Sequence, residues 1–77
     1  MSKEVSDEIS RHQVRNGMQV DVVRTDLDEY RAEVAKGEVI EHGHGPHGGM
    51  IKIRTENGPR EFSTESDEHF ETHIYRR

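Results

Sequence analysis

The feature that most constrains the fold is an alternating pattern of apolar residues on both sides of the turn signal Asn57-Gly58. Residues 50–55 alternate through Ile51 and Ile53, and residues 60–64 alternate again around Phe62, which is the period of a strand with one buried face. Asn-Gly is the pair that a two-residue type I′ turn requires. The sequence therefore predicts a β-hairpin at this point.

The register of that hairpin follows by counting outward from the turn. With Asn57-Gly58 as the turn, Ile53 faces Phe62 and Arg54 faces Glu61, so one face pairs two apolar side chains and the other pairs opposite charges. Pro59 cannot donate a backbone hydrogen bond, and its place beside the turn indicates an edge strand.

Two further strands are expected before the hairpin. Residues 18–24 alternate in the same way, and a second strand is predicted over residues 32–41. Between them, residues 26–30 form a loop or a turn of helix, and a longer helix from Leu27 remains an alternative. The apolar residues change from even to odd positions along the second strand, so a β-bulge is expected at Gly37.

A last strand near residues 70–74 follows a short helical turn at 66–68. Five short antiparallel strands with a tight hairpin and a single helical turn predict a mainly β fold, a small SH3-like barrel. Its expected core is Met18, Val20, Val22, Val34, Val39, Ile51, Ile53, Phe62, Phe70 and Ile74.

Composition restricts the rest of the chain. In 77 residues only 29% are hydrophobic, so there is room for one small core. Residues 1–16 contain few apolar side chains and are predicted to be a flexible tail, with a short helix docked on the body as the alternative, and residues 17–77 form the barrel domain. The chain has no Cys and no apolar run of membrane-spanning length, which predicts a cytoplasmic protein without a membrane partner. Weak self-association would help so small a core.

Part of the chain resembles a known family. The segments that carry the resemblance are Gly17-Met18-Gln19-Val20-Asp21-Val22-Val23, Lys36-Gly37-Glu38-Val39, Pro46-His47-Gly48, Ile51-Lys52-Ile53-Arg54 and Asn57-Gly58. Across residues 17–62 the chain is similar to the small, uncharacterised YwbE-like proteins, although Gly49-Met50 and the acidic segment 26–29 depart from their pattern. The resemblance implies a small barrel and supplies no known activity. A looser likeness to KOW-type domains implies contact with nucleic acid or the ribosome.

The segment from His42 to Gly49 is the natural place to look for a metal site. His42 and His44 share a face in an extended chain, and His47 could fold back to supply a third nitrogen ligand for zinc, copper or nickel. The alternative is a flexible surface loop without a ligand, in which glycines permit the turns. No other cofactor is expected, so a divalent metal held by His42, His44 and His47 is the one cofactor left open.

Cationic residues suggest a second surface. Lys52 and Arg54 project from the outer face of their strand, and Arg60 lies near the turn. Tyr75 stands beside the terminal pair Arg76-Arg77 and could serve as an aromatic platform for RNA or DNA. The chain is nevertheless acidic, with a formal net charge of −5, which opposes non-specific binding to phosphates.

No spacing in the sequence places a general base beside a nucleophile, so an enzyme is not expected. The function predicted from sequence is a non-catalytic binding module, most simply a protein-interaction adaptor that uses a barrel groove or a free sheet edge. Its alternatives are contact with RNA, DNA or the ribosome and binding of a divalent metal. The residues expected to form the working surface are His42, His44, His47, Lys52, Arg54, Arg60 and Tyr75.

Overall fold

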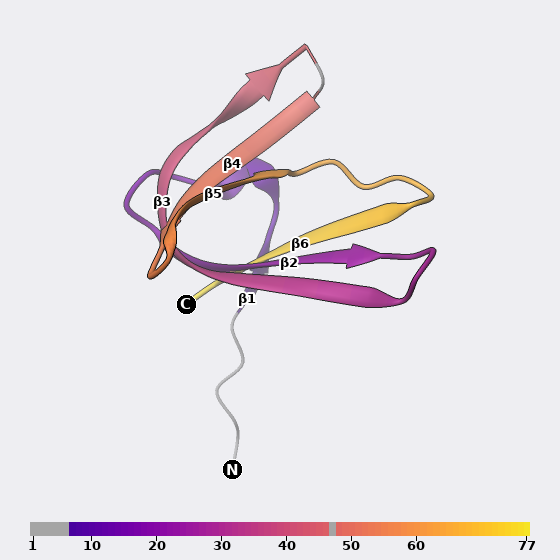
Figure 1. Ribbon diagram of the computed structural model, residues 1–77. Coiled ribbons are helices and arrows are strands. Elements are labelled where there is room, and N and C mark those ends of the chain that lie inside the picture. Colours follow the sequence, from indigo (N-terminus) through magenta and orange to yellow (C-terminus); the bar gives the residue numbers. More distant parts are fainter. Residues whose placement is uncertain (1–6, 47) are drawn as a thin grey trace.

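A computed structural model describes residues 7–46 and 48–77. Within these residues, six strands form one antiparallel sheet in the order β1-β6-β2-β3-β4-β5 (Figure 1). The elements are β1 Asp7–Ile9, the 3-10 turn η1 Arg11–Gln13, β2 Gln19–Asp26, β3 Arg31–Gly45, β4 Gly48–Thr55, β5 Gly58–Ser63 and β6 Phe70–Arg76. The prediction of a small, mainly β, barrel-like domain of antiparallel strands is confirmed, with six strands where five were expected.

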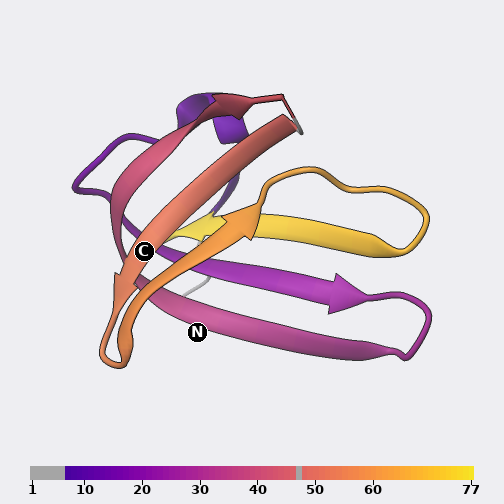
Figure 2. The same cartoon turned by 45° about the horizontal axis from the view of Figure 1, so that its top comes forward.

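The long strand β3 makes the sheet curl. Its first half pairs with β2 and its second half with β4, and a bulge between Val39 and Glu41 bends the strand where it passes from one partner to the other. The hairpins β2–β3 and β4–β5 consequently diverge, and their turns lie at opposite ends of the molecule (Figures 1 and 2). The inner faces of these two halves enclose the core.

The core is small and almost entirely aliphatic. Its buried residues are Val14, Val20, Val22, Ala35, Val39, Ile51, Ile53, Phe62 and Ile74, with Ile9 and Met18 packed against them. Seven of the ten predicted core residues are therefore buried, and Met18 and Phe70 are half-buried.

The prediction for Val34 is wrong, because its side chain is 55% exposed whereas that of Ala35 is 6% exposed. In the register of β2 with β3, Ala35 stands opposite Val22 on the inner face, and Val34 stands opposite Val23 on the outer face. The bulge that was expected at Gly37 lies instead after Val39, so Ala35 and Val39 point inward without any change of face between them.

Gly37 does not form the predicted β-bulge but allows a close approach of two strands. It pairs with Val20, and a Cβ atom at this position would lie 2.0 Å from the carbonyl oxygen of Arg54. No side chain fits at that distance, so the glycine lets the bent β3 pass close to the end of β4.

The β4–β5 hairpin is confirmed, but its predicted register is wrong by one turn position. Thr55 pairs with Gly58, so Glu56 and Asn57 form the two-residue loop. The Thr55 hydroxyl donates to the Gly58 carbonyl at 2.7 Å and accepts from the Asn57 N–H at 3.1 Å, which holds the turn at this position. Gly58, with a φ of 108°, then begins β5 in a conformation that favours glycine.

The cross-strand pairs shift accordingly. Phe62 faces Ile51, Lys52 faces Glu61, and Arg54 faces Pro59 rather than Glu61. The expected Arg54–Glu61 couple is therefore wrong, although the apolar residues keep their common face. β5 is the last strand of the sheet, which confirms the edge position predicted from Pro59.

The N-terminal part of the described chain belongs to the fold. β1 pairs with β6, the turn η1 follows, and the side chain of Val14 is 1% exposed within the core. The predicted flexible tail is therefore wrong for residues 7–16, whose short docked turn agrees better with the alternative. Residues 1–6 lie outside the described residues.

The two connecting segments contain no regular helix. Residues 27–30 form the turn of the β2–β3 hairpin, and the Asp26 carboxylate accepts the N–H groups of Asp28 and Glu29 there. The helical turn predicted at residues 66–68 is also wrong. The Asp67 carboxylate accepts the N–H groups of His69 and Phe70 instead, which turns the chain into β6.

Within the described residues there is no helix with the length and apolar character needed to cross a bilayer.

Candidate functional site

The inner face of the sheet changes from apolar to charged toward one end of the molecule. The row Ala35–Val22–Ile74 is buried, and these residues stand opposite one another on β3, β2 and β6. The next two rows outward in the same register are Glu33–Arg24–Thr72 and Arg31–Asp26–Phe70. The strands therefore carry charged side chains at the end where the two halves of the sheet diverge. We call this end of the molecule the mouth of the barrel.

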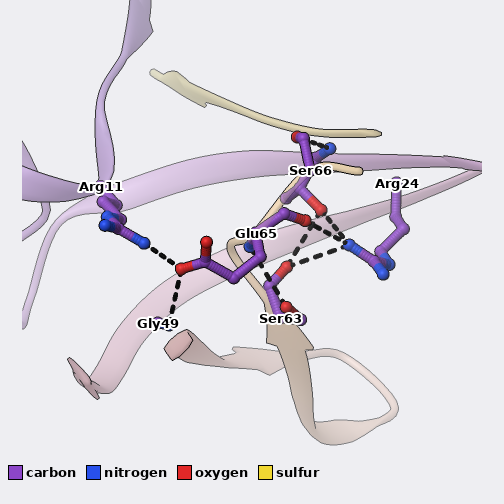
Figure 3. A network of polar contacts seen from close by, with 7 residues as sticks. Arg11, Arg24, Gly49, Ser63, Glu65 and Ser66 are labelled. Atoms are coloured by element: carbon purple, nitrogen blue, oxygen red, sulfur yellow. Dashed lines mark hydrogen bonds and ion pairs between the residues drawn. The ribbon is translucent and has the colours of Figure 1, made fainter. Parts of the chain in front are cut away.

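Arg24 closes one side of the mouth. Its guanidinium donates to the carbonyl oxygens of Ser63 and Glu65, at 3.3 and 3.1 Å (Figure 3). It also donates to the hydroxyl of Thr72. The Thr72 hydroxyl in turn donates to the Ser63 carbonyl at 3.0 Å. These bonds tie the end of β5 to β2 and β6, which are not its neighbours in the sheet.

Two arginine–phenylalanine stacks form the walls of the mouth. The guanidinium carbon of Arg24 lies 4.6 Å from the ring centroid of Phe70, and that of Arg60 lies 5.1 Å from the ring centroid of Phe62. Arg60 also forms an ion pair with Glu33 across the mouth. The stacking and pairing hold both guanidinium groups as flat polar surfaces.

An open cleft of about 770 Å³ lies between these walls. Arg31 is its most accessible cation, because its side chain is 78% exposed and its nearest carboxylate, that of Glu29, is 3.7 Å away. The principal side chains of this mouth cleft are Arg24, Arg31, Glu33, Arg60, Phe62 and Phe70.

The sheet edge at β5 is poorly suited to accept another strand. Thr64 N–H donates to the Gly49 carbonyl at 3.0 Å, and the alternation of an antiparallel ladder then directs the backbone groups of Pro59, Glu61 and Ser63 away from β4. Pro59 has no N–H, and the Ser63 carbonyl already accepts from Arg24 and Thr72. Only Glu61 presents both backbone groups.

The other edge strand, β1, spans three residues, Asp7–Ile9, within the part of the chain that the structure describes. Short strands and prolines are common devices that protect sheet edges from pairing. Of the two binding modes considered for an adaptor, the groove is therefore better supported than the edge.

A second polar cluster, centred on the Glu65 side chain, joins three segments of the chain. The Glu65 carboxylate accepts the Gly49 N–H at 2.8 Å and pairs with the Arg11 guanidinium (Figure 3). The Gly49 hydrogen bond, together with the nearby positive charge of Arg11, holds the pKa of Glu65 below its ordinary value of 4.5, although partial burial opposes the shift. Glu65 thus links η1, β4 and the β5–β6 loop.

Replacing Glu65 by alanine should lower the urea midpoint at pH 7 more than replacing it by glutamine, because glutamine keeps an oxygen for the Gly49 N–H. A carboxyl group with a depressed pKa stabilises the fold above its unfolded-state pKa, and this contribution is lost as pH falls through the folded-state value. The difference in midpoint between wild type and E65A should therefore shrink from pH 7 to pH 3. An equal difference at both pH values would contradict this role.

The predicted metal-binding segment is mostly strand. His42 and His44 belong to β3, where they stand opposite Ile51 and Gly49 with exposed side chains, and His47 lies outside the described residues. In residues 7–46 and 48–77, no three His, Cys, Asp or Glu side chains are arranged to hold a metal ion. A site that includes His47 stays a prediction.

The predicted cationic surface is distributed over several faces. Lys52 and Arg54 lie on the outer face of β4, with the Lys52 ammonium 3.6 Å from the Glu41 carboxylate and with Arg54 opposite Glu38. Arg60 lies at the mouth. Tyr75 lies on β6 opposite Asp21, separated from β4 by two intervening strands, and stacks on His73.

Sequence reasoning named Arg60 but missed Arg24, Arg31 and Glu33 as residues of a site. A usable signal existed, since Arg24 continues the even-numbered inward positions of β2 beyond Val22. The inward position of Glu33 depended on the register of β3, which was assigned to the wrong face.

Comparisons of the chain with protein-family models, curated proteins and solved structures found no match. The resemblance to the YwbE-like proteins stays a prediction.

Proposed function

We propose that this protein is a non-catalytic binding module whose mouth cleft takes a short segment of a protein partner. The observation that carries the proposal is the cleft itself, in which inward-facing strand positions hold arginines and phenylalanines immediately beyond the apolar core. Charged side chains at inward positions add little to a core, so a role in recognition explains their place better.

The chemistry of the cleft indicates the kind of segment that fits. Arg31 can donate hydrogen bonds to a carboxylate, and the stacked guanidinium groups of Arg24 and Arg60 can contact a planar aromatic side chain. Because Asp26 and Glu33 already accept internal partners, they are less available to a ligand cation. We therefore expect a segment with acidic and aromatic side chains.

Selection of random 12-residue peptides displayed on phage tests the proposal. Selected peptides should bind the wild-type protein and lose affinity by about tenfold or more in R31A, which removes a charge-assisted contact, and in R60A, which removes a stacking contact. R54A is the matched control, since it removes an exposed strand arginine from the outer face of β4. Equal affinity for all three variants would contradict binding in the cleft.

The nucleic-acid alternative is tested in the same variants. Lys52 and Arg60 each pair with an acid and Arg54 faces Glu38, so we expect single-stranded oligouridylate to show no binding at low salt. Binding that weakens with salt and in R54A would favour RNA contact over the peptide cleft. Ion pairs between exposed groups contribute little to stability, so R31A, R54A and R60A should all remain folded, as circular dichroism would verify.

A further inference from the structure

His69 lies at the rim of the mouth cleft between two carboxylates from different segments. Its Nδ1 is 2.9 Å from Asp28 Oδ2 in the β2–β3 turn, and its Nε2 is 3.5 Å from Glu68 Oε2 in the β5–β6 loop. The Asp28 contact is a hydrogen bond, and the Glu68 contact is a longer charge contact. A carboxylate on each side of the ring favours the imidazolium form over the neutral one.

A backbone hydrogen bond joins the same two segments. The Leu27 N–H donates to the His69 carbonyl at 2.8 Å and extends the pairing of β2 with β6 by one residue. The next residue, Phe70, and the nearby Asp26 both line the mouth cleft. The position of the β2–β3 turn, residues 27–30, thus sets one wall of the cleft.

The charges around His69 are mainly negative. Asp26 and Asp28 face it from the end of β2 and the turn, and Asp67 and Glu68 from the β5–β6 loop, while the positive charge of Arg24 on β2 acts on Asp67. With a neutral imidazole, the carboxylates of the turn and the loop would repel one another without an intervening positive charge.

We propose that His69 is a protonation-controlled clasp that holds the β2–β3 turn against the β5–β6 loop and thereby sets the width of the mouth cleft. The effect on partner binding rests on the proposed function, whereas the clasp itself does not. The hydrogen bond to Asp28 and the charges of Asp28, Asp67 and Asp26 raise the pKa of His69 above 6.5, against the opposing effect of burial. A raised pKa means that the clasp is complete below the unfolded-state value and is released as pH rises through the folded-state value.

A second histidine supplies the matched control. His73 Nδ1 is 2.5 Å from Glu8 and its Nε2 is 3.3 Å from Glu71, so it also lies between two carboxylates. It joins β1 to the outer face of β6, however, and does not contact the β2–β3 turn. Replacing it changes a similar interaction at a different place.

The test is hydrogen exchange of the Leu27 amide in the full chain without any ligand, from pH 5 to pH 9, corrected for the intrinsic exchange rate. Protection should fall about threefold or more as the His69 ring titrates, because the charge contact that opposes opening of this hydrogen bond is then lost. H69Q should show low protection at every pH and no step, and H73Q should keep the step.

A constant protection factor in the wild type, a step that persists in H69Q, or a measured pKa of His69 at or below 6.5 would overturn the clasp. Because no peptide is present, these results are independent of the binding test. Failure of the peptide selection with an intact step would remove the proposed function and leave the clasp.

Discussion

Replacing Gly37 by alanine should lower the free energy of unfolding by about 3 kcal/mol or more, which is a large part of the stability of a domain this small. The new Cβ would stand 2.0 Å from the Arg54 carbonyl oxygen, a backbone atom that moves only if β4 moves. The passage of β3 past the end of β4 shapes the whole curl of the sheet, so the strain cannot be relieved by one side chain.

Gly43 provides the matched control on the same strand. A Cβ at Gly43 meets nothing within 4 Å, and its backbone does not require glycine. G43A should therefore unfold within about 0.5 kcal/mol of wild type. Urea denaturation followed by circular dichroism measures both variants, and equal midpoints for G37A and G43A would show that β3 does not approach β4 as described.

Replacing Ala35 by aspartate should abolish the cooperative unfolding transition. Ala35 is 6% exposed among aliphatic side chains, and an unpaired buried charge costs about 3–5 kcal/mol. V34D places the same group one residue away on the outer face, where we expect a cost of no more than about 1 kcal/mol, the range of strand propensities. The reverse order of stability would mean that β3 faces the core through Val34.

The strands and most of the core could be predicted because they depend on local alternation. The alternation of Ile51, Ile53 and Phe62 survives a shift of the hairpin by one turn position, since that shift moves the pairing by two residues and keeps each side chain on its face. The position of the turn depends on the hydrogen bonds of the Thr55 hydroxyl. The turn preference of Asn57-Gly58 alone does not predict these bonds.

The face of β3 could not be predicted in the same way. Alanine at position 35 and valine at 34 suggest the wrong inward residue when only hydrophobicity is considered, and the bulge after Val39 depends on the partner strands. The burial of Val14 likewise follows from the pairing of β1 with β6, which are far apart in the sequence.

The mouth cleft was hidden for a related reason. Its arginines continue the inward positions of strands that begin as core, so they look like ordinary exposed charges until the curl of the sheet is known. Glu65 was also missed, because its partners Arg11 and Gly49 come from segments that only the fold brings together.

The most direct test of the binding role is NMR of the labelled protein with a peptide selected on it. We expect intermolecular contacts to the half-buried ring of Phe70 and shifts at Arg31 and Arg60, with the outer-face amides of Lys52 and Arg54 unchanged. Contacts confined to the outer face of β4 or to His42 and His44 would contradict this role.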